Sequence, residues 1–251
     1  MSRLLTLSTE VQQSLQTRQL LKVISGLTNF DTDSVKKISR AAGSGGADLI
    51  DIACSPDLVT LAKTVSGCSI CVSAVQPELF VEAVNSGATV IEIGNFDAFY
   101  SQGRIFRPAE VLELTRRARK LLPNVVLSVT VPHILPLDQQ EQLAIDLVLA
   151  GADLIQTEGG ITAKPISPGV LGLIEKAAPS LSAAYSISSA VNVPVLCSSG
   201  LSSITTPMAI AVGASGIGVG SAINRLQDEL SMVCVVRSLR NALLSLSIRV
   251  N

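Results

Sequence analysis

The chain has 251 residues, 47% of them hydrophobic and 16% charged, and its 19 basic and 20 acidic residues give a formal net charge of −1. A chain of this length and apolar content buries a large core, in one α/β domain or in two smaller ones. Because no field of one sign covers the molecule, a nucleic-acid partner is not expected.

Neither the N-terminal segment nor the longest uncharged interval has the sequence pattern of a signal peptide or of a membrane-spanning helix. The N-terminal segment, Met1 to Gln19, carries charges and has no long apolar core, so it predicts a first helix rather than a signal peptide. The interval from Ala177 to Asn224 has no charged residue, but Pro179, Pro194 and Pro207 interrupt it, so no membrane partner is expected. Five cysteines without a secretory signal indicate free thiols in a reducing compartment.

A glycine-alanine phrase recurs along the chain and marks repeating units. It begins at Gly46 (GADLIDIACS), Gly87 (GATVIEIGNF), Gly151 (GADLIQTEGG) and Gly213 (GASGIGVGSA). Each glycine stands where a helix C-cap belongs, and a short apolar strand follows it. Other β-branched runs lie between the copies: LLKVISG from Leu20, CSICVSAV from Cys68, NVVLSVTV from Asn124 and VPVLCSSG from Val193.

Helical periodicity fills the intervals between these strands. It predicts helices over Ser34–Gly43, Pro77–Gly87, Pro108–Leu122, Asp138–Gly151 and Thr205–Gly213, and a final helix over Asp228–Val250. Eight strand-helix units without a linker predict a single domain over residues 1–251, an α/β fold of the (β/α)8 TIM-barrel type. The N-terminal helix is expected to cap the bottom of this barrel. A doubly wound open sheet is the alternative, because its units repeat in the same way.

Alternate residues of each barrel strand point into the lumen, and the others must be apolar because helices cover them. This alternation sends Lys22, Asp51, Glu92 and Gln156 inward. Buried ions are costly unless they pair, so Lys22 is expected to neutralise one of the two carboxylates. The cluster is either a structural ion pair near the barrel floor or part of the catalytic machinery.

The loops that follow the strands supply further candidates, because TIM-barrel active sites lie at the C-terminal ends of the strands. Glu158 and His133, the only histidine, follow strands at this end and are candidates for an acid or base. Gly159 and Gly160 permit a close approach of the backbone to a ligand, and Gln156, on the strand before them, is also a candidate pocket residue. The loop NFDAFYSQGRIF holds Phe96 and three other aromatic residues and forms either the wall of a ligand pocket or a self-packed loop.

Glycine and serine cluster after the last two strands, in CSSGLSS and GVGSAIN. Many barrels bind phosphate there through backbone amides and a short helix N-terminus. The candidates for phosphate binding are Ser199, Gly200, Gly218, Gly220 and Ser221. Close packing of the backbone at the barrel rim is the alternative explanation for the glycines.

Several phrases of the chain resemble, in order, the family named for hypothetical chloroplast reading frame 23. They include KVISGLTNFD from Lys22, GADLIDIACSPD from Gly46, TVIEIGNFDAFY from Thr89, QTEGG from Gln156 and PVLCSSGLSS from Pro194. This family occurs in cyanobacteria and algal plastids, so the resemblance implies a barrel fold and a location in the cyanobacterial cytoplasm or the plastid stroma. It names no substrate.

The site residues together lead to a functional hypothesis. The chain is expected to bind a small phosphorylated metabolite and to act on it by proton transfer, as an isomerase, epimerase or lyase. Lys22, Asp51, Glu92, Glu158 and His133 are the candidate catalytic residues. No cofactor is expected, and a metal site is not expected from the CxxC of Cys68 because the chain has a single histidine. The alternative is a sensor or scaffold that retains an anion site without catalysis, and a homo-oligomer is possible in either case.

Overall fold

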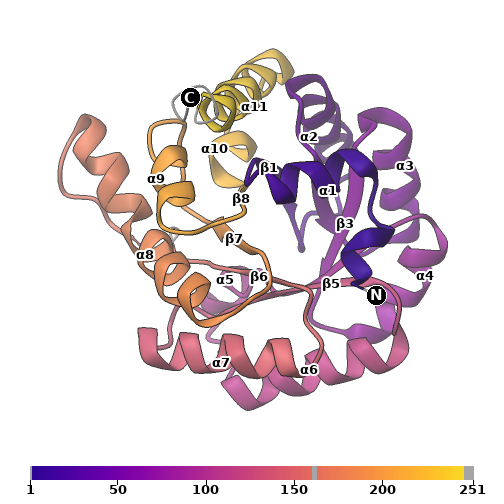
Figure 1. The fold of residues 1–251 in the computed structure, drawn as a ribbon. Helices are drawn as coiled ribbons and strands as arrows, with labels where there is room; N and C mark the ends of the chain where they lie inside the picture. The colour runs from indigo at the N-terminus through magenta and orange to yellow at the C-terminus, as the bar shows by residue number, and fades with distance from the viewer. Residues whose placement is uncertain (1, 160–162, 246–251) are drawn as a thin grey trace.

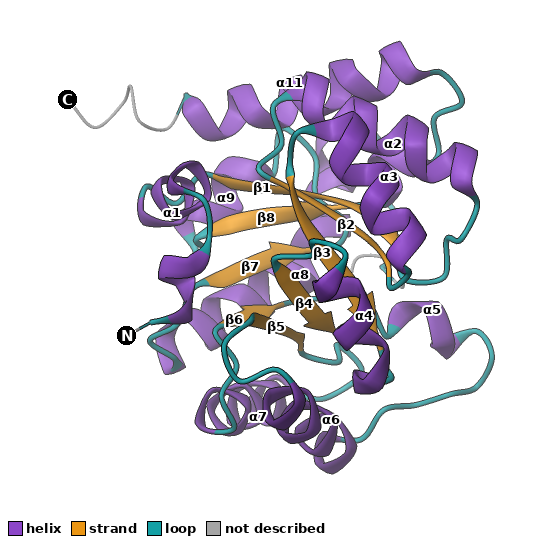
Figure 2. Ribbon diagram, turned by 90° about the vertical axis from the view of Figure 1, so that its right-hand side faces the viewer, coloured by secondary structure: helices purple, strands orange, loops and turns teal. Residues whose placement is uncertain are grey.

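A computed structural model describes residues 2–159 and 163–245 and has a closed barrel of eight parallel strands (Figures 1 and 2). The strands are β1 (Leu20–Gly26), β2 (Leu49–Ala53), β3 (Ser69–Ala74), β4 (Val90–Ile93), β5 (Val126–Thr130), β6 (Leu154–Gln156), β7 (Val195–Ser198) and β8 (Gly216–Val219). Each pairs with its neighbours in sequence, and β8 closes onto β1 with Leu20 opposite Gly216. The closure confirms the TIM barrel and excludes an open, doubly wound sheet.

Helices surround the barrel and connect its strands (Figure 1). They are α1 (Thr9–Gln16), α2 (Thr32–Gly45), α3 (Pro56–Ser66), α4 (Phe80–Asn85), α5 (Asp97–Tyr100), α6 (Pro108–Leu121), α7 (Leu137–Leu149), α8 (Gly169–Ala190), α9 (Thr206–Ala211), α10 (Ser221–Asn224) and α11 (Glu229–Leu244), with short 3-10 helices η1 (Arg3–Thr6) and η2 (Pro77–Leu79). The helix expected over Pro77–Gly87 is divided between η2 and α4, and the predicted end of the last helix lies outside the described residues.

The repeated glycines end helices by the predicted mechanism. Gly46, Gly87, Gly151 and Gly213 all have positive φ, between 86° and 116°. Such a conformation costs an L side chain steric energy, which glycine avoids. Each repeat therefore turns from helix to strand at its glycine.

The first layer of the lumen, at the end where the strands begin, is apolar. It contains Leu20, Leu49, Cys71, Val90, Val126, Leu154 and Leu196. The side chains of Leu7, Val11 and Leu15 belong to the same buried cluster, and α1 lies at this end of the barrel (Figure 2). The functional cavity must therefore lie at the opposite end.

Two of the repeats hold their strands in the same way on opposite sides of the barrel. Asp48 accepts hydrogen bonds from the Leu21 amide and from Arg240, and Asp153 accepts them from the Leu127 amide and from Arg119. The GAD phrases thus join β1 to β2 and β5 to β6 through equivalent aspartates. None of the described helices is long and apolar enough to span a membrane.

Candidate functional site

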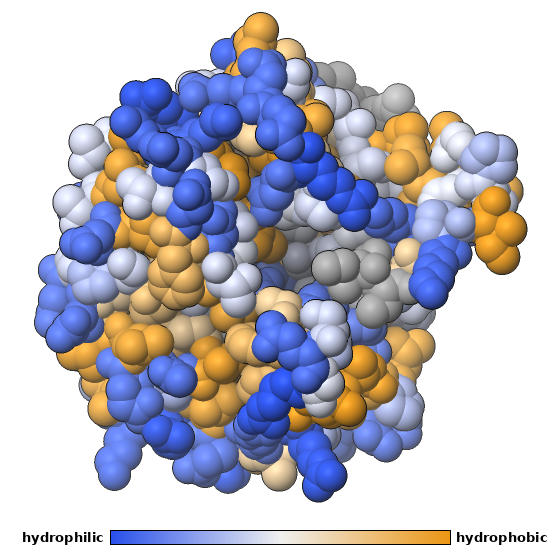
Figure 3. Space-filling model, turned by 180° about the vertical axis from the view of Figure 1, so that it is seen from behind, coloured by the Kyte–Doolittle hydropathy of each residue, from blue (hydrophilic) through white to orange (hydrophobic). Residues whose placement is uncertain are grey.

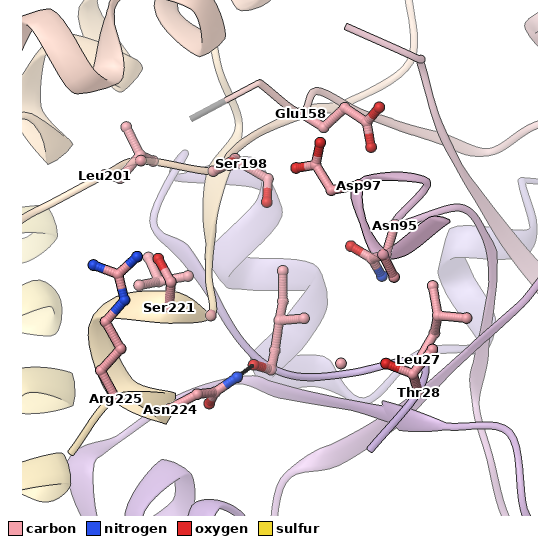
Figure 4. Close-up of a pocket in the computed structure, with 17 residues that line it drawn as sticks. Leu27, Thr28, Asn95, Asp97, Glu158, Ser198, Leu201, Ser221, Asn224 and Arg225 are labelled. Atoms are coloured by element: carbon pink, nitrogen blue, oxygen red, sulfur yellow. Dashed lines mark hydrogen bonds between the residues drawn. The ribbon is translucent and has the colours of Figure 1, made fainter. Parts of the chain in front are cut away.

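A cavity of about 390 Å³ opens at the end of the barrel where the strands finish. Figure 3 shows this face, which is hollowed near its centre. Loops after β1, β4, β6, β7 and β8 line the cavity. The polar and charged lining residues are Thr28, Asn95, Asp97, Glu158, Ser198, Ser199, Ser221, Asn224 and Arg225. The acidic residues lie on one side of the cavity and Ser221 and Arg225 on the other (Figure 4).

The acidic side is built around Glu158, which is only 4% exposed. Its Oε1 accepts a hydrogen bond from the Tyr100 hydroxyl at 2.5 Å and one from the His133 backbone amide at 3.2 Å. The His133 Nδ1 lies 3.2 Å from this same oxygen and 3.2 Å from Asp97 Oδ1. Among the described residues, neither Glu158 Oε2 nor Asp97 Oδ1 has a partner in hydrogen-bonding geometry. Two carboxylates and an imidazole thus share one small volume, and two of the carboxyl oxygens are buried there without a hydrogen bond from a described residue.

The surroundings of Asp97 and His133 raise the pKa values of both groups. Burial, and then the charge of Glu158, raise the pKa of Asp97 from 3.8 to about 7. Burial alone would lower the pKa of His133, but the hydrogen bond and charge of Glu158 and the charge of Asp97 outweigh it and raise the pKa above 6.5. Burial and Glu158 also raise the pKa of Tyr100, which keeps its hydroxyl a donor. The cluster therefore gains and loses protons in the pH range where general acid-base catalysis is efficient.

The opposite side of the cavity presents donors. Ser199 and Gly200 have φ values of 80° and 73°, so the chain turns sharply after β7. Within the described part of the chain, the backbone amides of Gly200, Leu201 and Ser221 donate no hydrogen bond. Arg225 lines the same side and has no ion pair with a described residue. Hydroxyls, free amides and a cation are the groups that bind an anion.

The short helix α10 and Arg225, which follows it, are fastened to the first strand. The Asn224 side-chain amide donates to the carbonyls of Ile24 and Ser25, at 3.0 and 3.1 Å. Gly220, at the start of this helix, approaches β1 closely, since a Cβ there would lie 3.2 Å from the Ile24 carbonyl oxygen. The donors of the eighth loop thus have a fixed position relative to β1.

The lumen cluster lies beneath the cavity and does not line it. Lys22 Nζ lies 2.6 Å from Glu92 Oε2 and 3.6 Å from Asp51 Oδ2, and all three side chains are at most 1% exposed. Gln156, also fully buried, donates to Glu92 Oε1 at 2.7 Å. The predicted inward orientation is correct for all four residues, but Gln156, which was also expected in the ligand pocket, is buried beneath the cavity and does not line it.

Asn95 separates the lumen cluster from the cavity. Its Nδ2 lies 3.3 Å from Asp51 Oδ2 and 3.2 Å from Glu92 Oε1, while the residue also lines the cavity. Its φ of 62° is a left-handed conformation that asparagine tolerates better than most residues. This turn leads the chain into α5, whose first residue, Asp97, lies beside Glu158 (Figure 4).

Opposing effects set the charges in the lumen. Burial alone would lower the pKa of Lys22, but the charges of Glu92 and Asp51 raise it above its usual value, so the ammonium is retained. Burial, partly offset by Lys22, raises the pKa of Asp51 from 3.8 to about 6. One cation thus faces two carboxylates, and the pair of Lys22 with Glu92 is the closer.

The remaining predicted residues lie in different places. Ser199, Gly200, Gly220 and Ser221 line the cavity. Gly218 does not: it lies in the lumen layer, where a Cβ would come within 2.8 Å of Ser198 Oγ, so close packing explains this glycine.

Phe96 differs from its predicted role as a pocket residue. It is fully buried, and its ring centroid lies 4.6 Å from that of Phe106, so the self-packed loop is the correct alternative for this residue. Gly159 leaves room for the histidine, since a Cβ there would lie 3.3 Å from His133 Cβ. Gly160 lies outside the described residues.

Sequence reasoning missed Asp97, Asn95 and Arg225. Asn95 and Asp97 follow β4 closely, so the rule that selected Glu158 and His133 at strand ends could also have selected them. Arg225 follows the glycine-rich eighth loop by one short helix and carries no comparable signal.

Two groups of described side chains bring potential metal donors within 4.8 Å of one another: Asp51, Cys71 and Glu92, and Asp97, His133 and Glu158. In the first group, Lys22 already supplies a positive charge. In the second, the imidazole lies between the two carboxylates. One divalent cation could be held by the second group, so a test of function must include a metal-free arm.

The family of the chain follows from a match along almost its whole length. A family model described as "Protein of unknown function (DUF561)" matches residues 7–248. The chain belongs to this family. A family member from Cyanophora paradoxa, "Uncharacterized protein ycf23", is 43% identical over 246 residues, covering 98% of each chain. The protein of the same name from Porphyra purpurea is 39% identical over 241 residues, covering 96% of this chain and 91% of its own. The resemblance predicted from the sequence phrases is confirmed.

Solved structures share the barrel at low sequence identity. Thiamine phosphate pyrophosphorylase from Pyrococcus furiosus superposes with a TM-score of 0.61 at 17% identity, covering 92% of this chain and 98% of that one. (S)-3-O-geranylgeranylglyceryl phosphate synthase from Thermoplasma acidophilum, in complex with its substrate sn-glycerol-1-phosphate, gives 0.61 at 13% identity, covering 94% and 99%. At these identities the likeness establishes the fold alone.

Proposed function

We propose that this family member is an enzyme that transfers a proton within a small phosphorylated metabolite, in an isomerase, epimerase or lyase reaction. One observation carries the proposal. A single cavity has anion-binding donors on one side and an acid-base cluster, with an Asp97 pKa of about 7, on the other. Such an arrangement anchors a phosphate at a distance from the carbon that reacts.

The phosphate would accept hydrogen bonds from the backbone amides of Gly200, Leu201 and Ser221, with Arg225 adding charge. This supports binding because charge-assisted bonds from amides and guanidinium are about twice as strong as neutral ones. The rest of the metabolite would extend toward Asp97 and Glu158. The solved synthase that holds sn-glycerol-1-phosphate has the same fold, which supports a substrate of this class.

The reaction would use the carboxyl groups of Asp97 and Glu158, the two acidic residues that line the cavity. Since two adjacent carboxylates repel each other, one of the pair holds a proton while the other is ionised. The ionised carboxylate would remove a proton from a carbon next to a carbonyl, and the protonated one would donate to the developing oxyanion or to a neighbouring carbon. Tyr100 and His133 orient Glu158 through their hydrogen bonds.

Lys22, Asp51 and Glu92 act in this proposal through the floor of the cavity. Asp51 and Glu92 accept hydrogen bonds from the Asn95 side chain, and Lys22 pairs with both carboxylates. The cluster would thereby position Asn95 and the start of α5. Lys22, Asp51 and Glu92 touch no substrate, so they are positioning residues. The same proposal includes the location expected from the family resemblance, the cyanobacterial cytoplasm or the plastid stroma.

Solvent exchange tests the proposal for isomerases, epimerases and lyases alike, because each moves a proton to or from carbon through a carboxyl group, and that group can exchange the proton with D2O. The protein is incubated in D2O with a panel of phosphorylated aldoses, ketoses and hydroxy acids, and loss of carbon-bound protons is followed by NMR. We expect exchange into at least one compound, and a reduction of roughly 10²-fold or more in Glu158→Gln. The matched control is Asp57→Asn, an exposed acid of α3 that does not line the cavity.

A second variant separates binding from chemistry. Gly220→Asp places a carboxylate at the anion side of the cavity; because its Cβ would lie 3.2 Å from the Ile24 carbonyl oxygen, circular dichroism and thermal unfolding first establish that the variant folds. We expect it to abolish binding of the phosphorylated compounds. Binding without exchange, with and without EDTA and added Mn²⁺, would instead favour a sensor that keeps an anion site.

A further inference from the structure

A second recess adjoins the cavity at the mouth of the barrel. It has a volume of about 240 Å³ and is formed by loops after β1, β2 and β3 together with α5. Its apolar walls include Leu27, Phe30, Val75, Leu79 and Phe99. We call it the apolar recess. It shares Leu27 and Thr28 with the main cavity, so the two hollows meet over the first loop.

The chemistry of the apolar recess is opposite to that of the cavity. Among the described residues, none that lines it is charged, whereas Asp97, Glu158 and Arg225 line the cavity. Phe30 is 59% exposed and Leu79 is 47% exposed at its edge, although both are large and apolar. Burying such side chains against a ligand is favourable, because apolar area leaves water.

The position of the recess indicates which ligand would use it. It holds few polar groups that could orient a separate molecule, since Thr28, Ser73 and Gln76 are its polar residues. Recognition groups lie instead in the adjoining cavity, where donors and carboxyls converge. A molecule anchored by its phosphate in the cavity can extend over Leu27 and Thr28 and place an apolar end in the recess. Most ligand sites combine an apolar surface with a few polar anchors in this way.

We infer that the substrate is amphiphilic: a phosphate ester whose far end carries an apolar group, alkyl or aromatic, that occupies the apolar recess. This inference rests on the proposed phosphate site and adds the substrate class to it. A simple sugar phosphate would leave the recess filled only with water.

A series of n-alkyl phosphates tests the inference. Inorganic phosphate and ethyl, butyl, hexyl and octyl phosphate are titrated into the wild-type protein by calorimetry. Once the chain is long enough to cross the cavity, each methylene that enters the recess is expected to tighten binding about 4-fold, since burial of a CH₂ group contributes about 0.8 kcal/mol. The chain-length dependence should then level off when the recess is full.

Substitutions at the edge of the apolar recess test whether the alkyl chain binds there. Phe30→Ser combined with Leu79→Ser should weaken octyl phosphate at least 10-fold and leave inorganic phosphate unchanged. Both side chains are about half exposed, so the fold is retained. The control is Leu149→Ser, which removes a leucine that is 81% exposed on α7. It should change neither affinity.

The outcomes distinguish this inference from the proposed function. If phosphate and ethyl phosphate bind but longer chains add nothing, or if the double variant binds octyl phosphate as the wild type does, the amphiphilic substrate is refuted and the phosphate site stands. If no phosphate compound binds, the phosphate site fails and the inference fails with it.

Discussion

Replacing Asp51 by Asn should stabilise the protein above pH 6, although the residue is buried in an ion cluster. The lumen holds one ammonium and two carboxylates, and Lys22 lies 1.0 Å closer to Glu92 than to Asp51, at 2.6 against 3.6 Å. Burial raises the pKa of Asp51 from 3.8 to about 6. Because the pKa of Asp51 is higher in the folded than in the unfolded state, the protonated carboxyl stabilises the fold. This stabilisation is complete below pH 4 and is lost as pH rises through 6.

The size of the effect follows from the shift. About two pKa units correspond to about 3 kcal/mol lost by ionisation of Asp51 at neutral pH. Asn keeps the hydrogen bond from Ser73, but it loses the 3.3 Å bond from Asn95, which costs about 1 kcal/mol. The net gain above pH 6 is therefore about 2 kcal/mol, or roughly 4 to 8 °C in Tm for a chain of this size.

Thermal and urea unfolding at pH 4.5 and pH 8 measure this difference. We expect Asp51→Asn to exceed the wild type at pH 8 and to lose that advantage at the lower pH. The matched variant Glu92→Gln should destabilise the protein by about 3 to 5 kcal/mol, because it deprives buried Lys22 of its closer partner. A destabilised Asp51→Asn at pH 8, or equal effects of the two substitutions, would refute the assignment of charges in the lumen.

Three further predictions concern the cavity and the helix packing. Asp97→Asn should remove the limb near pH 7 from the pH profile of kcat/KM, and an unchanged profile would exclude Asp97 from the proton transfer. Above pH 7 the variant should also unfold at a higher temperature than the wild type. The reason is that the pKa of Asp97 is raised to about 7, so ionisation of this group destabilises the folded state above that pH. Arg225→Gln should weaken phosphate binding about 10-fold and reduce the salt dependence of binding, as measured by calorimetry at two ionic strengths. If the variant and the wild type bind phosphate with equal affinity, Arg225 does not belong to the anion site. Gly43→Ala should lower the free energy of unfolding in urea by about 3 kcal/mol, because the added Cβ would lie 1.9 Å from the Ser66 carbonyl oxygen and push α2 away from α3. A decrease below about 1 kcal/mol would mean that the two helices can move apart at little cost.

The repeat along the chain explains why the fold could be predicted so fully. Gly46, Gly87, Gly151 and Gly213 each mark a local event, the end of a helix in a left-handed turn, and local events are encoded in adjacent residues. Strand alternation is local as well, and it is sufficient to place Lys22, Asp51, Glu92 and Gln156 in the lumen. These inferences need only periodicity and the requirement that outward residues be apolar.

The composition of the site depended on contacts between distant loops. Asp97, His133 and Glu158 come from the segments that follow β4, β5 and β6, and the distances between their donor atoms follow from the closure of the barrel and from the left-handed turn at Asn95. The sequence allowed Phe96 either to line a pocket or to pack within its own loop, and its contact with the Phe106 ring decides for packing. Sequence alone therefore determined the barrel, its inward charges and the end at which chemistry is expected. Tertiary structure alone decided which loops meet, because separations along the chain do not fix distances between loops, and those distances set the pKa values and the shape of the cavity.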